Sequence, residues 1–202
     1  MRNWEIMWKS KLIEFVKPFN HPAWGNKHFE RVYDLSIKLA SMQNADIDED
    51  SLFAAAYLHD IGAFEPYSQE GEDHSEIAVN NSEEILLYIN FPKEKIALVK
   101  DIIKSHMFYA KPSDHIESII FHDADTLDFL GAIGIARLLA IVGKEDWTPD
   151  LKSAIKLIQK FYNELPPKLI TLEAKKICEK RKSEMGDFLE NLSQQTDSFN
   201  LL

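Results

Sequence analysis

The sequence predicts an all-α protein, and three observations support this. Apolar residues recur at helical spacings along most of the 202 residues. Glycine occurs only 7 times and proline 8 times, and several of them separate the amphipathic segments. No stretch alternates between apolar and polar residues for long enough to indicate a β-sheet. We therefore expect a single domain over residues 1–202, built from roughly eight to ten helices.

The first half of the chain contains four expected helices with recognisable boundaries. Pro, Gly and Asn residues predict a loop over residues 19–26. In the second helix, apolar residues and His28 recur every three or four positions, which places them on one face. Asp and Glu near the starts of the third and fourth helices fit helix capping. The four segments are residues 4–16, residues 27–41, a segment from a cap at Asp48 or Asp50 to Gly62, and a segment from a cap at Asp73 to about Asn90.

The second half is expected to continue with helices. Pro92 can stand in a first helical turn, where its missing N–H does no harm. The helix that it starts carries Ile96, Val99, Ile103 and His106 on one face. Further helices are expected over residues 115–130, 132–142, 148–163 and from the Pro166–Pro167 break to about residue 192, followed by a polar, frayed tail over residues 193–202.

Composition excludes several partners and compartments. Asp and Glu number 33 against 23 Lys and Arg, a net charge of −10, which argues against binding long nucleic acids or an anionic membrane. The single cysteine, Cys178, cannot form an intramolecular disulfide, and the N-terminus lacks a signal-peptide pattern. The most apolar stretch, residues 129–143, contains Arg137 and is too short to span a bilayer. We therefore expect a cytoplasmic protein, and make no prediction of its oligomeric state.

Four histidines occupy positions that invite a functional explanation. His28, His59 and His106 lie at inward positions of expected helices, and His74 lies in the first turn of another. A lone histidine on an apolar face is more often a hydrogen-bonded core residue than a ligand. Several such histidines in one small helical domain are harder to explain in that way.

Acidic residues accompany these histidines. The pair His59–Asp60 ends an alanine-rich, apolar helix, where polar groups must be hydrogen-bonded or bind something. Asp125 projects among apolar neighbours, although a helix cap or a solvated acidic cluster would also account for it. Together His28, His59, Asp60 and Asp125 offer two imidazoles and two carboxylates from three helices. That set suits a divalent ion such as Mn, Fe, Co, Ni, Zn or Mg.

The same residues resemble the HD-domain superfamily of metal-dependent phosphohydrolases. The order His28, His59–Asp60, Asp125 matches the family, and so do the local sequences HFERV (28–32), AAYLHDIG (55–62) and DADTLDFLGAIGIAR (123–137). The last of these resembles a small bacterial subgroup of predicted HD hydrolases, except that Thr126 stands where that subgroup usually has Lys or Arg. The resemblance covers residues 20–143, and residues 144–202 are expected to form a helical extension of the HD-like bundle.

The resemblance implies a metal site and a reaction. The ligands carried over are His28, His59, Asp60 and Asp125, with Asp125 favoured over Asp123, which would then be a cap or a supporting residue. The implied reaction is hydrolysis of a small phosphorylated metabolite, of which a nucleotide is the expected case, by attack of a metal-activated water on phosphorus. Asp60 would also hold the attacking water or accept its proton.

Other residues receive expected roles on the same basis. His74 and His106 lie where some HD proteins bind a second metal, and otherwise they could bind phosphate or protonate the leaving group. Arg31 and Arg137 are candidate phosphate ligands, although structural ion pairs are the commoner role of arginine. Four aromatic residues, whose usual role is packing, could stack on a base: Phe64, Tyr67, Phe108 and Tyr109.

Two alternatives stay open at this point. A di-iron oxygenase on the same fold would need both His74 and His106 as ligands and a redox-active metal. A non-catalytic helical regulatory module would keep the site only for structure. Measurements of metal content, phosphate release and O₂ consumption distinguish the phosphohydrolase, the oxygenase and the regulatory module.

Overall fold

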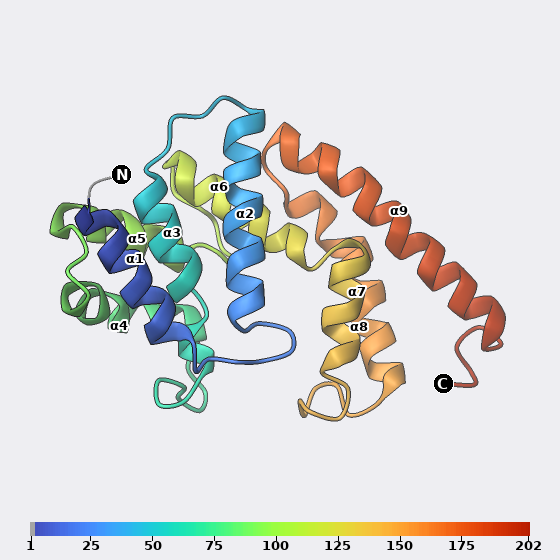
Figure 1. Ribbon diagram of the computed structural model, residues 1–202. Coiled ribbons are helices and arrows are strands. Elements are labelled where there is room, and N and C mark those ends of the chain that lie inside the picture. Colours follow the sequence, from blue (N-terminus) through green and yellow to red (C-terminus); the bar gives the residue numbers. More distant parts are fainter. Residues whose placement is uncertain (1–2) are drawn as a thin grey trace.

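The protein is helical throughout the part that the computed structural model describes, residues 3–202, so the predicted fold class is confirmed (Figure 1). No strand occurs among these residues. They form nine α-helices and three short 3₁₀ turns: α1 (Asn3–Val16), α2 (Asn26–Met42), α3 (Glu49–Leu58), η1 (Ile61–Ala63), α4 (His74–Tyr88), η2 (Lys93–Lys95), α5 (Ile96–Lys104), α6 (Ile116–Asp128), α7 (Gly131–Ala140), α8 (Leu151–Glu164), η3 (Pro166–Lys168) and α9 (Leu172–Gln195).

Two helices, α2 and α6, cross in the middle of the molecule and pack extensively on each other. On one side of them lie α1, α3, α4 and α5, and on the other side lie α7, α8 and α9 (Figure 1). Residues from Trp8 to Met185 contribute to one hydrophobic core. The carboxyl-terminal end of α3 therefore meets α2 and α6 near the centre, and residues 59 and 60 follow that end directly.

Helix starts agree well with the capping pattern in the sequence. The Asp48 carboxylate accepts a hydrogen bond from Ser51 N, and the Asp73 carboxylate accepts one from Ser75 N. Such bonds satisfy N–H groups that the first turn leaves without a helical partner. The start of α8 differs from the prediction: the helix begins at Leu151 rather than at residue 148, and Asp150 caps it by accepting from Ser153 N.

The helix expected to carry His106 is shorter than predicted. A 3₁₀ turn precedes α5, which ends at Lys104, so His106 lies just beyond the helix. The His106 N–H bonds to the Ile103 carbonyl, which closes a tight turn at the helix end. This turn still directs the imidazole inward, and the side chain is fully buried.

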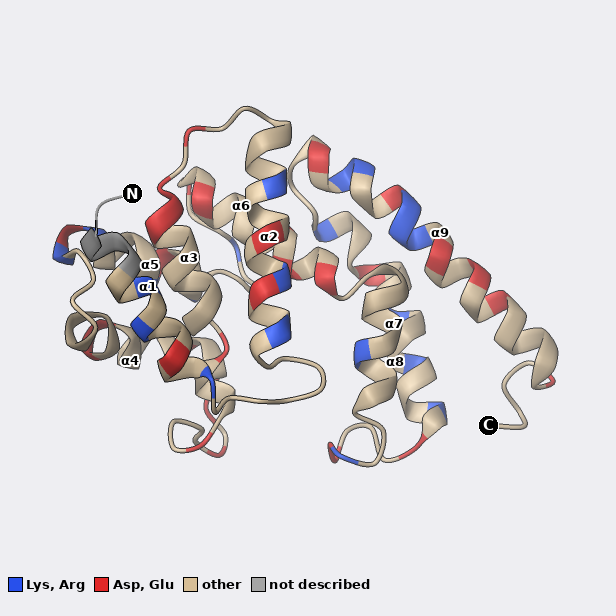
Figure 2. Ribbon diagram, viewed as in Figure 1, with Lys and Arg blue, Asp and Glu red and all other residues tan. Residues whose placement is uncertain are grey.

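The carboxyl-terminal region packs against α6 and α7. Asp123, from the middle of α6, accepts hydrogen bonds from Ile170 N, Thr171 N and Thr171 Oγ1 at the start of α9. Arg181 donates to the Leu127 carbonyl. The first half of α9 carries a run of basic residues in an otherwise acidic protein (Figure 2). None of the described helices is both long and apolar enough to cross a membrane.

Candidate metal centre

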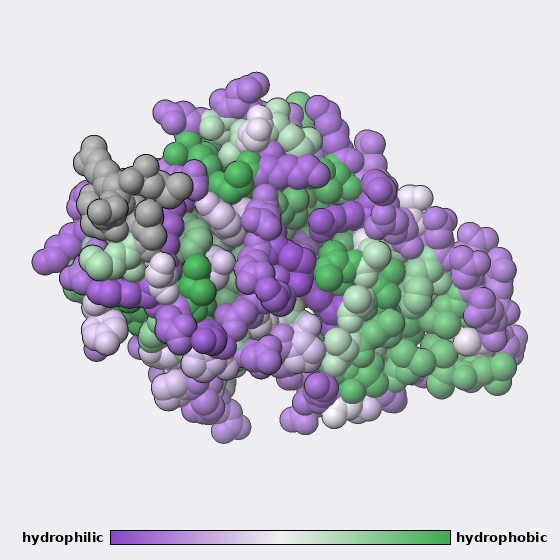
Figure 3. Space-filling model, viewed as in Figure 1, coloured by the Kyte–Doolittle hydropathy of each residue, from purple (hydrophilic) through white to green (hydrophobic). Residues whose placement is uncertain are grey.

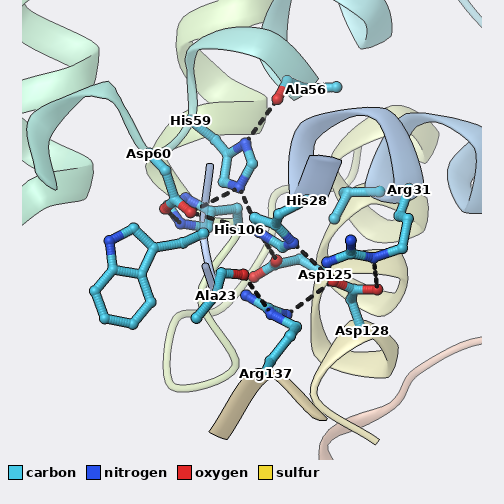
Figure 4. A network of polar contacts seen from close by, with 12 residues as sticks. Ala23, His28, Arg31, Ala56, His59, Asp60, His106, Asp125, Asp128 and Arg137 are labelled. Carbon is cyan, nitrogen blue, oxygen red and sulfur yellow. Dashed lines mark hydrogen bonds and ion pairs between the residues drawn. The ribbon is translucent and has the colours of Figure 1, made fainter. Parts of the chain in front are cut away.

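Four side chains from three helical segments converge beside the crossing of α2 and α6 (Figure 4). His28 comes from α2, His59 and Asp60 follow α3, and Asp125 comes from α6. The His28 Nε2 atom lies 3.1 Å from His59 Nε2, 3.2 Å from Asp125 Oδ1 and 3.4 Å from Asp60 Oδ2. All four residues are buried. The structure thus brings together the four residues that the sequence analysis selected as metal ligands.

Asp60 also faces a second pair of histidines. Its Oδ1 atom lies 3.4 Å from His74 Nε2 and 3.6 Å from His106 Nε2, whereas its Oδ2 atom faces His28 and His59. Ligand atoms of Asp60, His74 and His106 lie within 4.8 Å of one another, and so do those of His28, His59 and Asp60. The Asp60 carboxylate therefore joins two neighbouring groups of donors.

The outer ring nitrogens of three histidines have hydrogen-bond acceptors. The Nδ1 of His28 lies 2.7 Å from the Asp128 carboxylate, that of His59 lies 2.9 Å from the Ala56 carbonyl, and that of His106 lies 2.7 Å from the Ile103 carbonyl. Since each acceptor requires a proton on Nδ1, the tautomer that these bonds select directs the Nε2 lone pairs of His59 and His106 inward. This is the arrangement in which histidine binds a metal.

Two inward-facing donor atoms lack a hydrogen bond. His106 Nε2 and Asp125 Oδ1 are fully buried and have no hydrogen-bond partner, although Asp125 Oδ1 lies near His28. A buried polar atom without a partner is costly. Lone pairs and carboxylate oxygens that face one another in this way fit a cation, so the residues present suit a bound divalent ion.

The charges at the centre are strongly coupled. Burial would raise the pKa of Asp60, but the adjacent imidazoles of His59, His106 and His28 outweigh it and hold that pKa well below its usual range. Burial lowers the pKa of His59. Burial also acts to lower the pKa of His28, yet the nearby carboxylates of Asp125, Asp128 and Asp60 raise it to about 9. In the metal-free protein a proton on His28 therefore offsets the charge of the carboxylates, and a divalent cation can replace that proton.

Asp128 is an important residue that the sequence analysis did not select. It accepts hydrogen bonds from His28 Nδ1, from Arg31 Nε and a terminal amino group at 3.0 and 2.9 Å, and from Arg137 at 2.9 Å (Figure 4). Burial would raise the pKa of Asp128, but these partners hold it far below its usual range. The signal available in the sequence was the spacing of three from Asp125, which places both carboxylates on one helix face.

Of the two arginines predicted as phosphate ligands, only Arg137 lines the cavity. Arg31 binds Asp128 through two nitrogens and does not line the cavity beside the centre. Arg137 is buried, binds Asp128 and the Ala23 carbonyl, and lines the cavity, and one of its terminal nitrogens has no partner. Both side chains fix Asp128, and Arg137 in addition has an unused donor at the cavity.

The cavity has a volume of about 280 Å³ and opens from the donor atoms toward α7 and α8. A notch is visible at the lower edge of the molecule between its two halves (Figure 3). The ionisable residues that line the cavity are His28, Asp60, His74, Asp125 and Arg137, and the apolar residues are Ala23, Trp24, Ala63, Met107, Phe108, Phe129, Leu138, Trp147 and Phe161. Its size suits a small molecule rather than a polymer.

Of the four aromatic residues predicted to stack on a base, only one lines the cavity. Phe108 lines the cavity. Phe64 and Tyr67 pack around Phe19, and the Tyr109 hydroxyl donates to Asp73. The principal aromatic rings of the cavity, Trp24 and Trp147, were not selected. They are separated by more than a hundred residues, so no local pattern could pair them.

Glycine at position 62 allows Asp60 and His74 to approach each other. A Cβ at this position would lie 2.2 Å from the His74 carbonyl oxygen and 2.9 Å from the Ile77 Cβ. Only glycine therefore lets η1 pack closely against the first turn of α4. This contact holds Asp60, two residues earlier, beside His74.

The remaining histidines lie away from these donors. His21 stacks on Trp24 and lies 3.2 Å from Glu145. His115 is exposed and precedes α6. His122 is buried beside Asp123, and Asp123 itself points to the start of α9 rather than to the donors.

Comparison with known proteins identifies the family. The family model described as HD domain matches residues 26–130, which is more than half of the chain. The chain belongs to the HD-domain family. This agrees with the resemblance in the sequence and covers His28, His59, Asp60 and Asp125, whereas Arg137 and the two tryptophans of the cavity lie outside the matched residues. No curated protein matches the chain.

Solved structures share the fold of this HD domain over nearly its whole length. Bacillus subtilis YpgQ in complex with ADP is 23% identical with a TM-score of 0.67, and the alignment covers 95% of this chain and 96% of that chain. A predicted HD superfamily hydrolase from an uncultured Thermotogales bacterium is 24% identical, with a TM-score of 0.64 and coverage of 96% and 99%. An HD-superfamily hydrolase from Bacillus thuringiensis is 25% identical, with a TM-score of 0.66 and coverage of 96% and 99%.

Proposed function

We propose that the protein is a metal-dependent phosphohydrolase that acts on a small phosphorylated metabolite, in particular a nucleotide. One observation carries this proposal: buried imidazole nitrogens and carboxylate oxygens, some without a hydrogen bond, converge at one end of a small cavity. Membership of the HD-domain family supports a divalent metal and hydrolysis.

The proposed ligands of the first ion are His28, His59, Asp60 and Asp125, and those of a second ion are Asp60, His74 and His106. Imidazole and carboxylate donors suit Mn, Fe, Co, Ni, Zn or Mg. When bound, such an ion lowers the pKa of a water molecule and so supplies a nucleophile for phosphorus at neutral pH. Asp128 supports the first site, because its hydrogen bond orients the His28 ring.

Residues of this chain can also move a proton and hold the substrate. His74 lines the cavity and is partly exposed. Burial acts to lower its pKa, but the Asp60 carboxylate outweighs this and raises it, which favours the protonated form. A protonated His74 at the cavity wall can donate to a phosphate oxygen or to the leaving group. In that role His74 would not ligate a second ion at the same time.

Arg137 is the proposed phosphate ligand. One terminal nitrogen is bound to Asp128, while the other is buried, without a partner, in a side chain that lines the cavity. A guanidinium donor beside the metal ligands suits a phosphate oxygen. Arg31 is better assigned to holding Asp128.

A nucleotide is the favoured substrate for two reasons. The B. subtilis YpgQ structure, which has the same fold, was solved in complex with ADP. The cavity combines a cationic and metal-binding end with an aromatic wall, which suits a molecule that has phosphate at one end and a ring at the other.

The di-iron oxygenase keeps one specific observation in its favour, namely the second donor group of Asp60, His74 and His106. It requires a redox-active metal and O₂ consumption. Among the residues that the structure describes, no feature favours the non-catalytic regulatory module.

The decisive experiment screens phosphorylated metabolites with Mn, Co, Ni, Zn and Mg, with His59→Ala as the blank. Phosphate or pyrophosphate release by the wild type alone supports the proposal. Iron-loaded protein that consumes O₂ and releases no phosphate would support the oxygenase instead. Purified protein that binds no metal and hydrolyses no phosphate compound would support the regulatory module.

A further inference from the structure

The cavity is lined by two chemically different sets of residues. His28, Asp60, His74, Asp125 and Arg137 supply its ionisable groups, and the remaining lining residues are apolar or aromatic. No Ser, Thr, Asn, Gln or Tyr occurs among the described residues that line it. The only polar side-chain groups of this apolar part are the indole N–H groups of the two tryptophans.

Two loops that are far apart in the chain contribute tryptophans to the aromatic part. Trp24 precedes α2, and Trp147 lies between α7 and α8. Their rings are nearly parallel, with centroids 6.1 Å apart and an interplanar angle of 21°. His21 covers Trp24 in a further stacked contact at 3.7 Å. The three rings therefore form a stack whose last member is Trp147.

Trp147 is unusual among the large apolar side chains because 52% of it is exposed although it lines a cavity. An exposed tryptophan leaves apolar surface in water, and a planar ligand ring that covers it gains stacking and burial. Phe108, Phe129 and Phe161 lie in mutual edge contacts along the same cavity. They offer further ring surface to an apolar ligand group.

We propose that this aromatic wall, with Trp147 as its principal residue, binds a planar ring of the substrate by stacking and does not select among nucleobases by hydrogen bonds. The proposal rests on the proposed function, and it names the part of the substrate that the site recognises besides phosphate. Base edges differ in their donors and acceptors, and reading them requires matching side-chain groups. The wall lacks such groups except for the two indole donors, so nucleotides of different bases and simple aryl phosphates should be accepted, and ring-free sugar phosphates should be poor substrates.

The test compares Trp147→Ala, Trp147→Phe and the control Tyr88→Ala, which removes an exposed aromatic ring of α4 outside the cavity. For nucleotides and phenyl phosphate, Trp147→Ala should raise KM about tenfold, the order expected for one lost stacking contact, and should leave kcat nearly unchanged. Trp147→Phe should restore most of the loss. For ribose 5-phosphate neither variant should change KM.

Two results would overturn the proposal. One is an equal effect of Trp147→Ala on ring-bearing and ring-free substrates, because a structural role would produce that pattern. The other is a difference of about a hundredfold or more in kcat/KM between adenine and guanine nucleotides, since such a ratio requires hydrogen-bond readout.

A binding experiment separates this proposal from the phosphohydrolase assignment. Adenosine, guanosine and cytidine, which carry no phosphate, are titrated into chelator-treated protein, and the intrinsic tryptophan fluorescence is followed in the wild type and in Trp147→Ala. Saturable quenching that Trp147→Ala weakens would uphold the ring site even if no phosphate compound were hydrolysed. Absence of nucleoside binding to a protein that does hydrolyse nucleotides would refute the ring site and leave the phosphohydrolase assignment intact.

Discussion

The Asp128 carboxylate accepts a hydrogen bond of 2.7 Å from His28 Nδ1, so one acidic residue of α6 fixes the ring whose other nitrogen faces Asp125. Asp128 in turn is held by Arg31 and Arg137. This chain of contacts makes the orientation of a proposed ligand depend on residues that need not touch the metal.

Asp128→Asn is expected to weaken metal binding by about ten- to a hundredfold, the usual effect of losing a partner that orients a ligand histidine. The substitution keeps the shape but removes the charge that Arg31 and the buried Arg137 neutralise, so stability should also fall, by about 3 kcal/mol. Metal titration and urea unfolding measure the two effects. The surface variant Asp187→Asn serves as the control, and unchanged metal affinity in Asp128→Asn would refute the orienting role.

The number of ions depends on His74 and His106. If Asp60 joins two ions, wild-type protein should bind two divalent ions per chain, and His106→Ala should bind one while keeping the site at His28. His115→Ala, which changes an exposed histidine, should behave like the wild type. Metal content measured by mass spectrometry decides the matter, and a single ion in the wild type would refute the second site and leave His74 to substrate binding alone.

Gly62→Ala should separate η1 from α4. Its Cβ would lie 2.2 Å from the His74 carbonyl oxygen, so the backbone must shift, and we expect a loss of about 2–3 kcal/mol of unfolding free energy together with lower activity. Gly186→Ala is the matched control, because the nearest atom to its Cβ is 3.5 Å away and alanine favours a helix. Equal stability of the two variants would contradict the close-approach explanation.

Raising the pH should destabilise the metal-free protein. Folding raises the pKa of His28 from 6.5 to about 9, so the stabilisation that its proton provides is complete below about pH 6.5 and is lost as the pH rises through 9. Urea unfolding in the presence of a chelator should therefore show a falling midpoint over this range. His28→Gln should lack this component, and saturating metal should abolish it, because the ion replaces the proton. A midpoint that rises with pH in the metal-free wild type would show that His28 is neutral when folded.

The sequence by itself predicted the helical class, a cap at Asp48 or Asp50, the cap at Asp73 and the four residues whose side chains meet at the centre. These properties are local, because they depend on apolar periodicity, on capping side chains and on short motifs. One motif places His59 next to Asp60, and another places Asp125 among the apolar residues of its own helix. The ends of helices were less predictable, as α5 and α8 show, because competing turns near a helix end differ little in free energy.

Other properties of the centre arise only from tertiary contacts. The two oxygens of Asp60 face different histidine pairs because Gly62 lets η1 approach α4. Arg31 and Arg137 meet on Asp128 because α2, α6 and α7 pack together. Trp24 and Trp147 are brought together by loops that are far apart in the chain. Local periodicity predicts which way a side chain points from its own helix. The residue that it then contacts depends on how distant helices pack, and that packing is determined by the complete set of core residues rather than by any local segment.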